Sequence, residues 1–388
     1  MTLVFHQDVP GPGMHALVIG VAGYPHCGAA APEGSLPAGI PDVSTAEVTA
    51  LEMAGWLVET QRKDAVLPLA SLEVLVSSAA GGPAPVLEVD GQSKKVEGAA
   101  FDPVCEAIIR WRDRCQDPSA TALFYFAGHG LARWRGDEAL LLADFGRLPD
   151  APFQKALDTH RLVDGMGYCQ ARTQLFFFDC CREIREEALQ LDRLNAQVVL
   201  TPGRNDWLRR TSLLTLHATA LGGSAFGRRR QPTRFSRELR AAFDGLASEQ
   251  GEDGVWRIQA GKLLGAVQSV RDRTTLPGDE RDHLPTSGLV EAPTQLPIRE
   301  LDGPPLVPFS IRCDPAEAAR AAELLLTDRA SGASVGPGRP GSPWQGETRA
   351  GIYDLTARFP HGGWRDVSEK NRWLLPPRYS RRMPLERS

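Results

Sequence analysis

Short apolar runs alternate with stretches of helical periodicity along the first two thirds of the chain. The apolar runs are too short for helices and too uniformly apolar to leave one face in water, which is typical of strands buried on both faces. We expect strands at 15–21, 72–77, 121–126, 173–178 and 212–219. Helical periodicity falls between them, at 43–59, 102–115, 151–164 and 182–195. This alternation predicts an α/β fold with a doubly wound, mostly parallel sheet flanked by helices.

The pattern changes after about residue 273. Proline and glycine become dense and helical periodicity fades, which is typical of a linker. Further on, short runs with alternating apolar and polar positions predict strands at 308–312, 321–327, 348–359 and 372–375. We therefore predict an α/β domain over 1–275, a Pro/Gly-rich linker over 276–304 and a small β-sandwich accessory domain over 305–388.

Composition narrows the class of protein. A chain of 388 residues with 42% hydrophobic residues can bury one large core and a smaller one. The formal net charge of −4 gives no reason to expect nucleic acid or a membrane as a partner. No stretch has the length and apolarity of a membrane helix, and the first residues do not resemble a signal peptide. Seven cysteines without framework spacing indicate a reducing compartment, so we expect a cytoplasmic protein.

The candidate chemistry lies where two predicted strands end. The motif Gly-His-Gly at 128–130 follows one apolar run, and Asp-Cys-Cys at 179–181 follows the next long one. Parallel neighbouring strands end at the same edge of a sheet, so His129 and Cys181 should meet there. A thiol beside an imidazole is the arrangement that nucleophilic thiol catalysis needs. The glycines around His129 allow a sharp turn, and the Gly130 N–H is well placed to hold an oxyanion.

These motifs resemble those of the caspase-like cysteine peptidases, in particular the bacterial, metacaspase and paracaspase branches. Further segments of this chain are similar to that family, over roughly residues 13–275: HALVIGVAGY at 15–24, Pro-Asp-Val at 41–43, SLLTLHATALGGSAF at 212–226 and FSRELRAAFDG at 235–245. The Gln-Ala-Cys-Arg-Gly motif of animal caspases is missing, so specificity for aspartate does not follow. In the last third, AGIYDLTARF at 350–359 resembles a strand of transthyretin-like sandwiches.

The resemblance implies a caspase-like fold and a cysteine endopeptidase with a Cys-His dyad. Cys181 would be the nucleophile, His129 the base, and the N–H groups of Gly130 and Cys181 the oxyanion donors. Strand alternation sends Cys180 to the opposite face, where it would pack inward. No metal or organic cofactor is required, and calcium activation, which occurs in some metacaspases, stays open.

Two carboxylates are candidates for the pocket that holds P1, the substrate residue before the cleaved bond. By strand alternation, Asp179 should point into the same crevice as Cys181. Asp42 matches the position that lines this pocket in paracaspases and metacaspases. An anionic pocket suits arginine or lysine at P1 and repels aspartate. The alternative is that each carboxylate caps a helix, and for Asp42 the Pro-Asp dipeptide before a helical run supports it.

Other features allow more than one interpretation. The connection between Cys181 and the strand at 212 is where related peptidases cleave themselves, but it could equally be a plain surface loop; it contains Arg193, Arg204, Arg209 and Arg210. His217 is expected to be a hydrogen-bonded core histidine, and the arginines at 228–230 a solvated loop.

The expected partner is a protein or peptide substrate, and the family suggests a role in cell death or antiphage defence. The alternative function is that of a pseudo-peptidase or scaffold whose carboxy-terminal domain recruits a regulatory protein.

Overall fold

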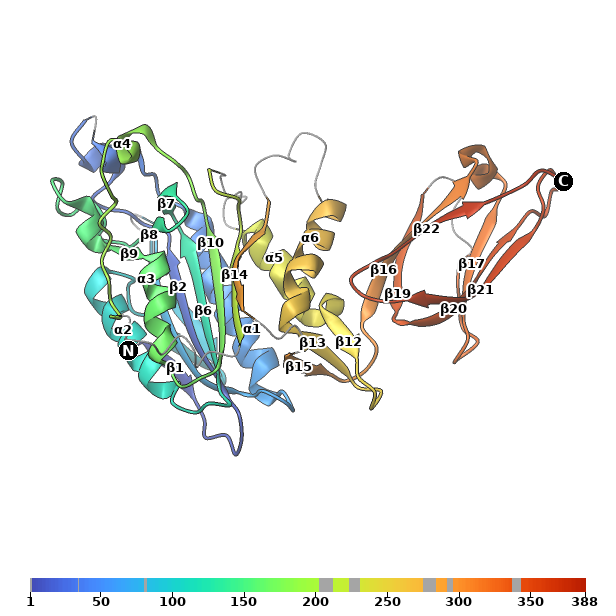
Figure 1. Ribbon diagram of the computed structural model, residues 1–388, viewed down its shortest axis with the longest axis horizontal. Helices are drawn as coiled ribbons and strands as arrows, with labels where there is room; N and C mark the ends of the chain where they lie inside the picture. The colour runs from blue at the N-terminus through green and yellow to red at the C-terminus, as the bar shows by residue number, and fades with distance from the viewer. Residues whose placement is uncertain are drawn as a thin grey trace. The chain divides into compact units, whose positions relative to one another are not determined.

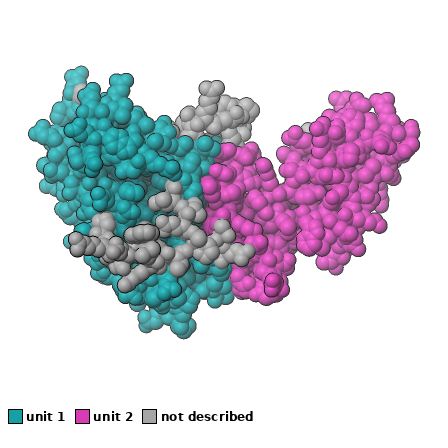
Figure 2. All heavy atoms as spheres, viewed as in Figure 1, with its two compact units in different colours: residues 1–238, 274–299 teal, residues 239–273, 300–388 magenta. Residues whose placement is uncertain are grey.

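The computed structural model describes residues 2–33, 35–79, 82–201, 212–222, 231–274, 284–291, 296–336 and 343–388. The chain divides into two compact units (Figure 2). One consists of Met1–Glu238 and Thr274–Arg299, and the other of Leu239–Arg273 and Glu300–Ser388. The predicted division at 1–275, 276–304 and 305–388 stays a prediction.

A seven-stranded sheet forms the centre of the first unit (Figure 1). In spatial order its strands are β1 (Leu3–His6), β3 (Leu69–Ser77), β2 (Met14–Val21), β6 (Thr121–Gly128), β10 (Thr173–Cys180), β11 (Ser212–His217) and β14 (Thr286–Glu291). The five inner strands are mutually parallel, and the edge strands β1 and β14 pair antiparallel. The mostly parallel sheet predicted from the apolar runs is therefore confirmed.

Helices cover both faces of this sheet, as a doubly wound fold requires. On one face, Trp111 of α2 (Phe101–Arg114) packs against Phe124 and Phe176, with ring centroids 5.9 and 6.2 Å away. On the other face lies α1 (Ser44–Thr60), so close to β2 that a side chain at Gly20 would come within 2.5 Å of Ala50. The chain entering α5 (Arg234–Ala241) joins α1 there, because the Thr233 N–H donates to the Thr49 hydroxyl. The α/β class is thus established by the fold itself.

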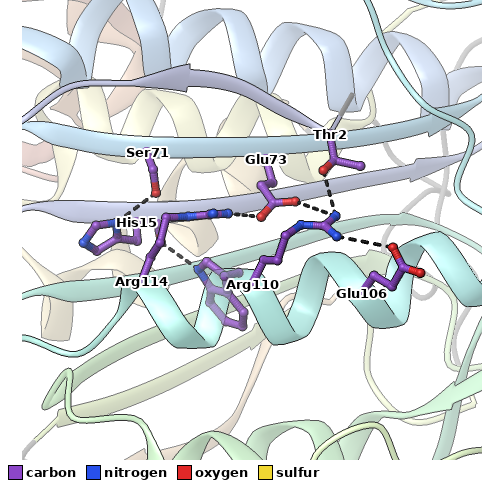
Figure 3. A network of polar contacts seen from close by, with 8 residues as sticks. Thr2, His15, Ser71, Glu73, Glu106, Arg110 and Arg114 are labelled. Carbon is purple, nitrogen blue, oxygen red and sulfur yellow. Dashed lines mark hydrogen bonds and ion pairs between the residues drawn. The ribbon is translucent and has the colours of Figure 1, made fainter.

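A buried carboxylate attaches α2 to the sheet (Figure 3). Glu73 of β3 is fully buried and forms ion pairs with Arg110, at 3.3 Å, and with Arg114. Between these two arginines, the Trp111 indole N–H donates to the His15 carbonyl of β2 at 2.9 Å. Because a buried charge is tolerated only when it is paired, these contacts determine how α2 sits along the strands.

Two predicted helices are wrong in large part. The range 151–164 contains a 3-10 turn (Pro152–Lys155), then β9 (Ala156–Asp158), and only then α3 (Thr159–Gly165). β9 pairs with β8 (Asp137–Leu141), which pairs with β7 (Gly130–Trp134). Of the range 182–195, only α4 (Glu186–Leu189) is helical. The carbonyls of Arg182 and Glu183 accept hydrogen bonds from Gly222 and Ala132, so they are not available to a helix.

The two units contain further short elements. β4 (Val86–Val89) and β5 (Gln92–Lys95) form a hairpin, as do β12 (Ser248–Gln250) and β13 (Trp256–Gln259). α6 (Leu263–Thr274) precedes the range 276–304. That range was expected to be a linker, yet it contains β14 and β15 (Pro297–Leu301). The strand pairing of β14 with β11 is a long-range contact that proline and glycine content does not reveal.

Two small sheets enclose a second core after residue 305. The first sheet has β16 (Leu306–Asp314), β19 (Trp344–Arg349) and β22 (Tyr379–Pro384). The second has β17 (Glu323–Asp328), β18 (Ser334–Val335), β20 (Gly351–Arg358) and β21 (Val367–Leu374). Ile311 of the first sheet and Leu326 and Leu355 of the second are fully buried in one shared cluster. The predicted β-sandwich is therefore present.

Candidate active site

The candidate site lies at the carboxyl ends of β2, β6 and β10. The chain leaves β2 toward β3 on one side, and then crosses back to β6, β10 and β11 on the other. The order therefore reverses between β2 and β6, which is where open α/β sheets form ligand crevices. Tyr24 and Asp42 follow β2, His129 follows β6, and Cys181 follows β10.

The strand register brings His129 and Cys181 side by side. β6 and β10 are paired in parallel up to Gly128 and Cys180, and the two candidate residues come next on each strand. Neighbouring residues in register on parallel strands have their Cα atoms side by side, so the main chain brings His129 and Cys181 to adjacent positions. Pairing resumes just beyond them with a bridge between Leu131 and Glu183. The register therefore brings the main chains of these two residues together at one edge of the sheet, and their pairing as a catalytic dyad stays a prediction.

Gly130 packs directly against the cysteine strand. A Cβ atom at Gly130 would lie 2.5 Å from the Cys181 carbonyl oxygen and 2.8 Å from the Cys180 sulfur. Any larger residue would push the turn carrying His129 away from Cys181, which explains the second glycine of the motif. The assignment of the Gly130 and Cys181 N–H groups as oxyanion donors stays a prediction.

The two adjacent cysteines have different surroundings. Cys180 is 3% exposed and belongs to the core cluster with Phe178, as strand alternation predicted. Burial raises the pKa of the Cys180 thiol well above its ordinary value, so it is a poor nucleophile. Cys181 is only half-buried. All seven cysteines lie in the described ranges, and none of them forms a disulfide.

Three hydrogen bonds fix His129. Its backbone N–H donates to the Tyr24 phenol oxygen at 2.8 Å, and its carbonyl accepts the Leu141 N–H at 3.0 Å. Its ring atom Nε2 lies 2.8 Å from the Pro41 carbonyl oxygen. A carbonyl can only accept, so Nε2 carries the proton and the basic lone pair of the neutral ring lies on Nδ1. The side chain is thus held in the tautomer that a base acting through Nδ1 needs.

The surroundings keep His129 neutral. Burial is the largest effect and lowers the pKa of the imidazole below its ordinary value. The Pro41 carbonyl and the carboxylates of Glu183 and Asp42 act in the opposite direction, whereas the positive charge of Arg185 lowers the pKa further. At neutral pH the ring is therefore free to accept a proton.

Asp42 is exposed at the loop between β2 and α1. Its Oδ1 accepts the Tyr24 N–H at 2.8 Å, which closes the turn after β2. The N-cap position of α1 is occupied by Val43, whose side chain makes no capping bond. The role of Asp42 in the P1 pocket stays a prediction.

Asp179 lies on the predicted face of β10 but is 3% exposed. Its Oδ2 accepts hydrogen bonds from the hydroxyls of Tyr125 and Thr233. The Thr233 hydroxyl also accepts the Ser236 N–H at 3.2 Å, so it caps the start of α5. Asp179 thus supports a helix cap indirectly. Its role in the P1 pocket also stays a prediction.

Sequence reasoning missed the roles of Tyr24 and Pro41. Tyr24 is 3% exposed, and its ring packs on the His129 imidazole with centroids 5.0 Å apart. The only available signal was an aromatic residue with a polar tip three residues after the end of β2. Pro41 acts through its main-chain carbonyl, a group that every residue has, so its residue type gives no signal of this role.

His217 is a core residue, as expected. It is 6% exposed, stacks on Phe178 at 4.9 Å and lines a small pocket with Cys180 and Cys181. Burial, reinforced by the charge of Arg182, lowers the pKa of His217 to about 3.

Several predicted features fall outside the described residues: Arg204, Arg209, Arg210 and the arginines at 228–230. Arg193 is described and exposed, and self-cleavage there stays a prediction.

Within the described ranges, no three His, Cys, Asp or Glu side chains are grouped so that they could hold a metal ion. None of the helices in the described part of the chain has both the length and the apolarity to span a bilayer.

Comparisons with known proteins find a likeness among solved structures. No family model matches the chain, and no curated protein matches it significantly in sequence. Among solved structures, caspase-1 from Spodoptera frugiperda is similar over 77% of this chain and 100% of that chain, with 11% sequence identity and a TM-score of 0.42. At that level the likeness supports no statement about activity or site residues.

Proposed function

We propose that this protein is a cysteine endopeptidase of the caspase-like kind, with Cys181 as nucleophile and His129 as general base. The observation that supports it most is the register of β6 and β10, because His129 and Cys181 directly follow the paired ends of these strands, next to the switch point between β2 and β6. The Nε2–H tautomer of His129 adds a basic nitrogen at Nδ1.

The proposed reaction passes through a thioester. His129 Nδ1 takes the thiol proton of Cys181, and the thiolate attacks the scissile carbonyl carbon. The N–H groups of Gly130 and Cys181 stabilise the oxyanion of the tetrahedral intermediate. The imidazolium then protonates the leaving amine as the C–N bond breaks. In the second half, His129 deprotonates a water molecule that hydrolyses the thioester and regenerates the thiol.

The Pro41 carbonyl takes the place of a third catalytic side chain. It accepts a hydrogen bond from the Nε2–H of the neutral ring. The same carbonyl would keep this bond to the imidazolium that forms when Nδ1 is protonated. This contact therefore orients the ring and stabilises its charged form, as the carboxylate does in a three-residue triad.

The test of this function is a comparison of the two adjacent cysteines. We would label the purified protein with an electrophilic arginyl peptide, locate the adduct by peptide mapping, and assay peptide cleavage. We expect the adduct on Cys181 and loss of cleavage in Cys181→Ala. Cys180→Ala is the matched control and should still cleave, since its side chain packs into the core. An adduct on Cys180, or an active Cys181→Ala, would contradict the proposal.

We propose cleavage after arginine or lysine. Asp42 is the stronger candidate for reading a cationic P1 residue, because it is exposed beside the site and its charge reaches His129. Asp179 is more deeply placed and already accepts two hydroxyl hydrogen bonds. Its charge would act from beneath the pocket.

Replacing each aspartate by asparagine removes its charge and keeps its hydrogen-bond acceptor, so the effect of the charge can be measured apart from the effect on local structure. Asp42→Asn keeps an acceptor for the Tyr24 N–H, and Asp179→Asn keeps one for Tyr125 and Thr233. For matched peptides with Arg, Lys, Leu or Asp at P1, we expect Asp42→Asn to lower the Arg-to-Leu ratio of kcat/KM by about tenfold or more. A preference for Asp in the wild type, or an unchanged ratio in both variants, would rule out this pocket.

The alternative function, a scaffold, is favoured by the large exposed side chains of the carboxy-terminal unit, Trp373 and Leu306. A scaffold would retain its cellular role in Cys181→Ala, whereas a peptidase would lose it. Self-processing near Arg193 and a role in defence belong to the peptidase proposal, and sequencing of the termini after incubation would test the first.

A further inference from the structure

We propose that Tyr24 is a positioning residue of this site, whose phenol oxygen holds the His129 backbone and so directs the imidazole toward Cys181. The inference rests on the proposed function, because the residue that Tyr24 positions is the proposed base. Tyr24 would act through His129 and not on the substrate.

Hydrogen bonds join Tyr24, His129 and Leu141 in a ring. The Tyr24 oxygen accepts the His129 N–H at 2.8 Å and lies 3.3 Å from the Leu141 carbonyl, to which its single proton can be donated. Leu141 in turn donates its N–H to the His129 carbonyl at 3.0 Å. One phenol thus connects the turn after β6 with the end of β8, and His129 lies between them.

The Tyr24 oxygen occupies the space where β6 ends. A Cβ atom at Gly128 would lie 3.0 Å from it, which is tighter than an ordinary contact. The first glycine of the Gly-His-Gly motif therefore leaves room for the phenol and for the Phe126 ring, which would also lie 3.0 Å away, and the second leaves room for Cys181. The Tyr24 ring also packs on the imidazole, so both the backbone and the side chain of His129 contact one residue.

Tyr24 acts by hydrogen bonding and not by proton transfer. Burial raises the pKa of its phenol well above the ordinary value, so the group keeps its proton at neutral pH. The nearby thiols of Cys180 and Cys181 contribute in the same direction. The turn after β2 is in turn held by Asp42, which accepts the Tyr24 N–H.

The test compares two buried phenols. Tyr24→Phe keeps the ring and removes the oxygen from the site. Tyr353→Phe removes an equally buried phenol oxygen, which bonds Thr348 and the Arg349 carbonyl in the sandwich, and it serves as the control. Two quantities are measured in both variants: kcat and KM for an arginyl peptide, and the pH dependence of iodoacetamide alkylation at Cys181, read by peptide mapping.

We expect Tyr24→Phe to lower kcat about tenfold, a part of what a general base contributes, with KM within about twofold. The midpoint of the alkylation profile should move to higher pH, because a misplaced His129 accepts the thiol proton less readily. Tyr353→Phe should change neither quantity. A purely structural role for Tyr24 would lower the melting temperature and leave the alkylation midpoint unchanged, and that result would overturn the proposal.

The outcomes separate this inference from the proposed function. If the wild type cleaves no peptide but the alkylation midpoint still shifts in Tyr24→Phe, the peptidase proposal fails and the positioning role stands. If wild type and Tyr24→Phe cleave equally, the positioning role fails and the peptidase stands. If Tyr24→Phe does not fold, Gly128→Ala replaces it, because the added methyl group presses toward the same Tyr24 oxygen. An unshifted alkylation midpoint of Cys181 in Gly128→Ala would also overturn the inference.

Discussion

At the residue scale, two oppositely charged residues beside His129 should shift the pH dependence of cleavage in opposite directions when each is neutralised. The pKa of His129 is lowered mainly by burial, and the acid limb of kcat/KM should therefore lie below the ordinary histidine value of about 6.5. Glu183 raises this pKa and Arg185 lowers it. Glu183→Gln should thus move the acid limb to lower pH, and Arg185→Gln to higher pH. The measurement is the pH profile of peptide cleavage, and shifts in the same direction would contradict it.

His217 makes stability depend on pH. Its folded-state pKa of about 3 lies below the unfolded value near 6.5, so the folded state excludes a proton that the unfolded chain binds. Its contribution is present above pH 6.5 and is lost as pH falls toward 3. Between pH 7 and pH 5 this amounts to roughly 2 kcal/mol of unfolding free energy.

The measurement is denaturant unfolding at both pH values in the wild type and in His217→Gln. The variant cannot be protonated, so its loss of stability on acidification should be smaller by about that amount, roughly 2 kcal/mol. An equal loss in both proteins would show that His217 is accessible to protons in the folded state. Other titrating groups are common to both chains and cancel in the comparison.

The sequence predicted the residues of the site that carry recognisable chemistry, but not those that act through the main chain. His129 and Cys181 stand at the ends of apolar runs, so strand pairing alone juxtaposes them. Pro41 and Tyr24 act through a carbonyl and through a contact with a backbone N–H. Both depend on the path of the loop after β2, which local residue types do not determine.

At the element scale, the attachment of α2 to the sheet should be the most sensitive to charge removal. Glu73→Gln leaves two arginines beside a buried position without their carboxylate. We expect it to cost about 3 kcal/mol of unfolding free energy, as for other broken buried ion pairs. Glu106→Gln is the control: its carboxylate pairs with the same Arg110 at 3.3 Å but is 72% exposed, and its loss should cost at most about 0.5 kcal/mol.

Thermal or urea unfolding of the two variants measures this difference. Equal stabilities would mean that the buried carboxylate is replaceable, which is the outcome seen when a well-packed neutral group substitutes for an ion pair. Peptide cleavage should be retained in both variants, because Glu73 lies in the middle of β3 and not at its carboxyl end.

The strands predicted most closely are the five inner strands of the central sheet, β2, β3, β6, β10 and β11. Buried strands such as β6 and β10 have a continuous apolar run at their centre, so they are recognised without knowledge of their partners. The range 182–195 has helical periodicity, but its first residues pair with β7 and with the chain after β11. β9 is similarly a strand because β8 offers it an edge. Such pairings are decided by distant segments and override local propensity.

At the scale of the whole molecule, removal of the residues from Gly303 onward tests the role of the sandwich. Trp256 is buried against Val307 and Ala350, all in the second unit. A chain that ends at Asp302 should therefore expose Trp256 and lose solubility, while Trp256→Gln in the same truncation should restore it. We expect peptide cleavage at the wild-type rate in the soluble truncation. A folded but inactive truncation would show that the sandwich completes or gates the site.

The site is assembled from segments that are far apart in the order of synthesis. Tyr24, His129 and Cys181 come together only through β2, β6 and β10, and β6 lies between the other two strands. No fragment that leaves the ribosome before residue 181 contains both the thiol and the imidazole in contact. The proposed dyad would therefore act neither on neighbouring proteins nor on the chain itself until the middle of the sheet has closed. For the peptidase that we propose, the onset of cleavage would report the pairing of β2, β6 and β10 during folding.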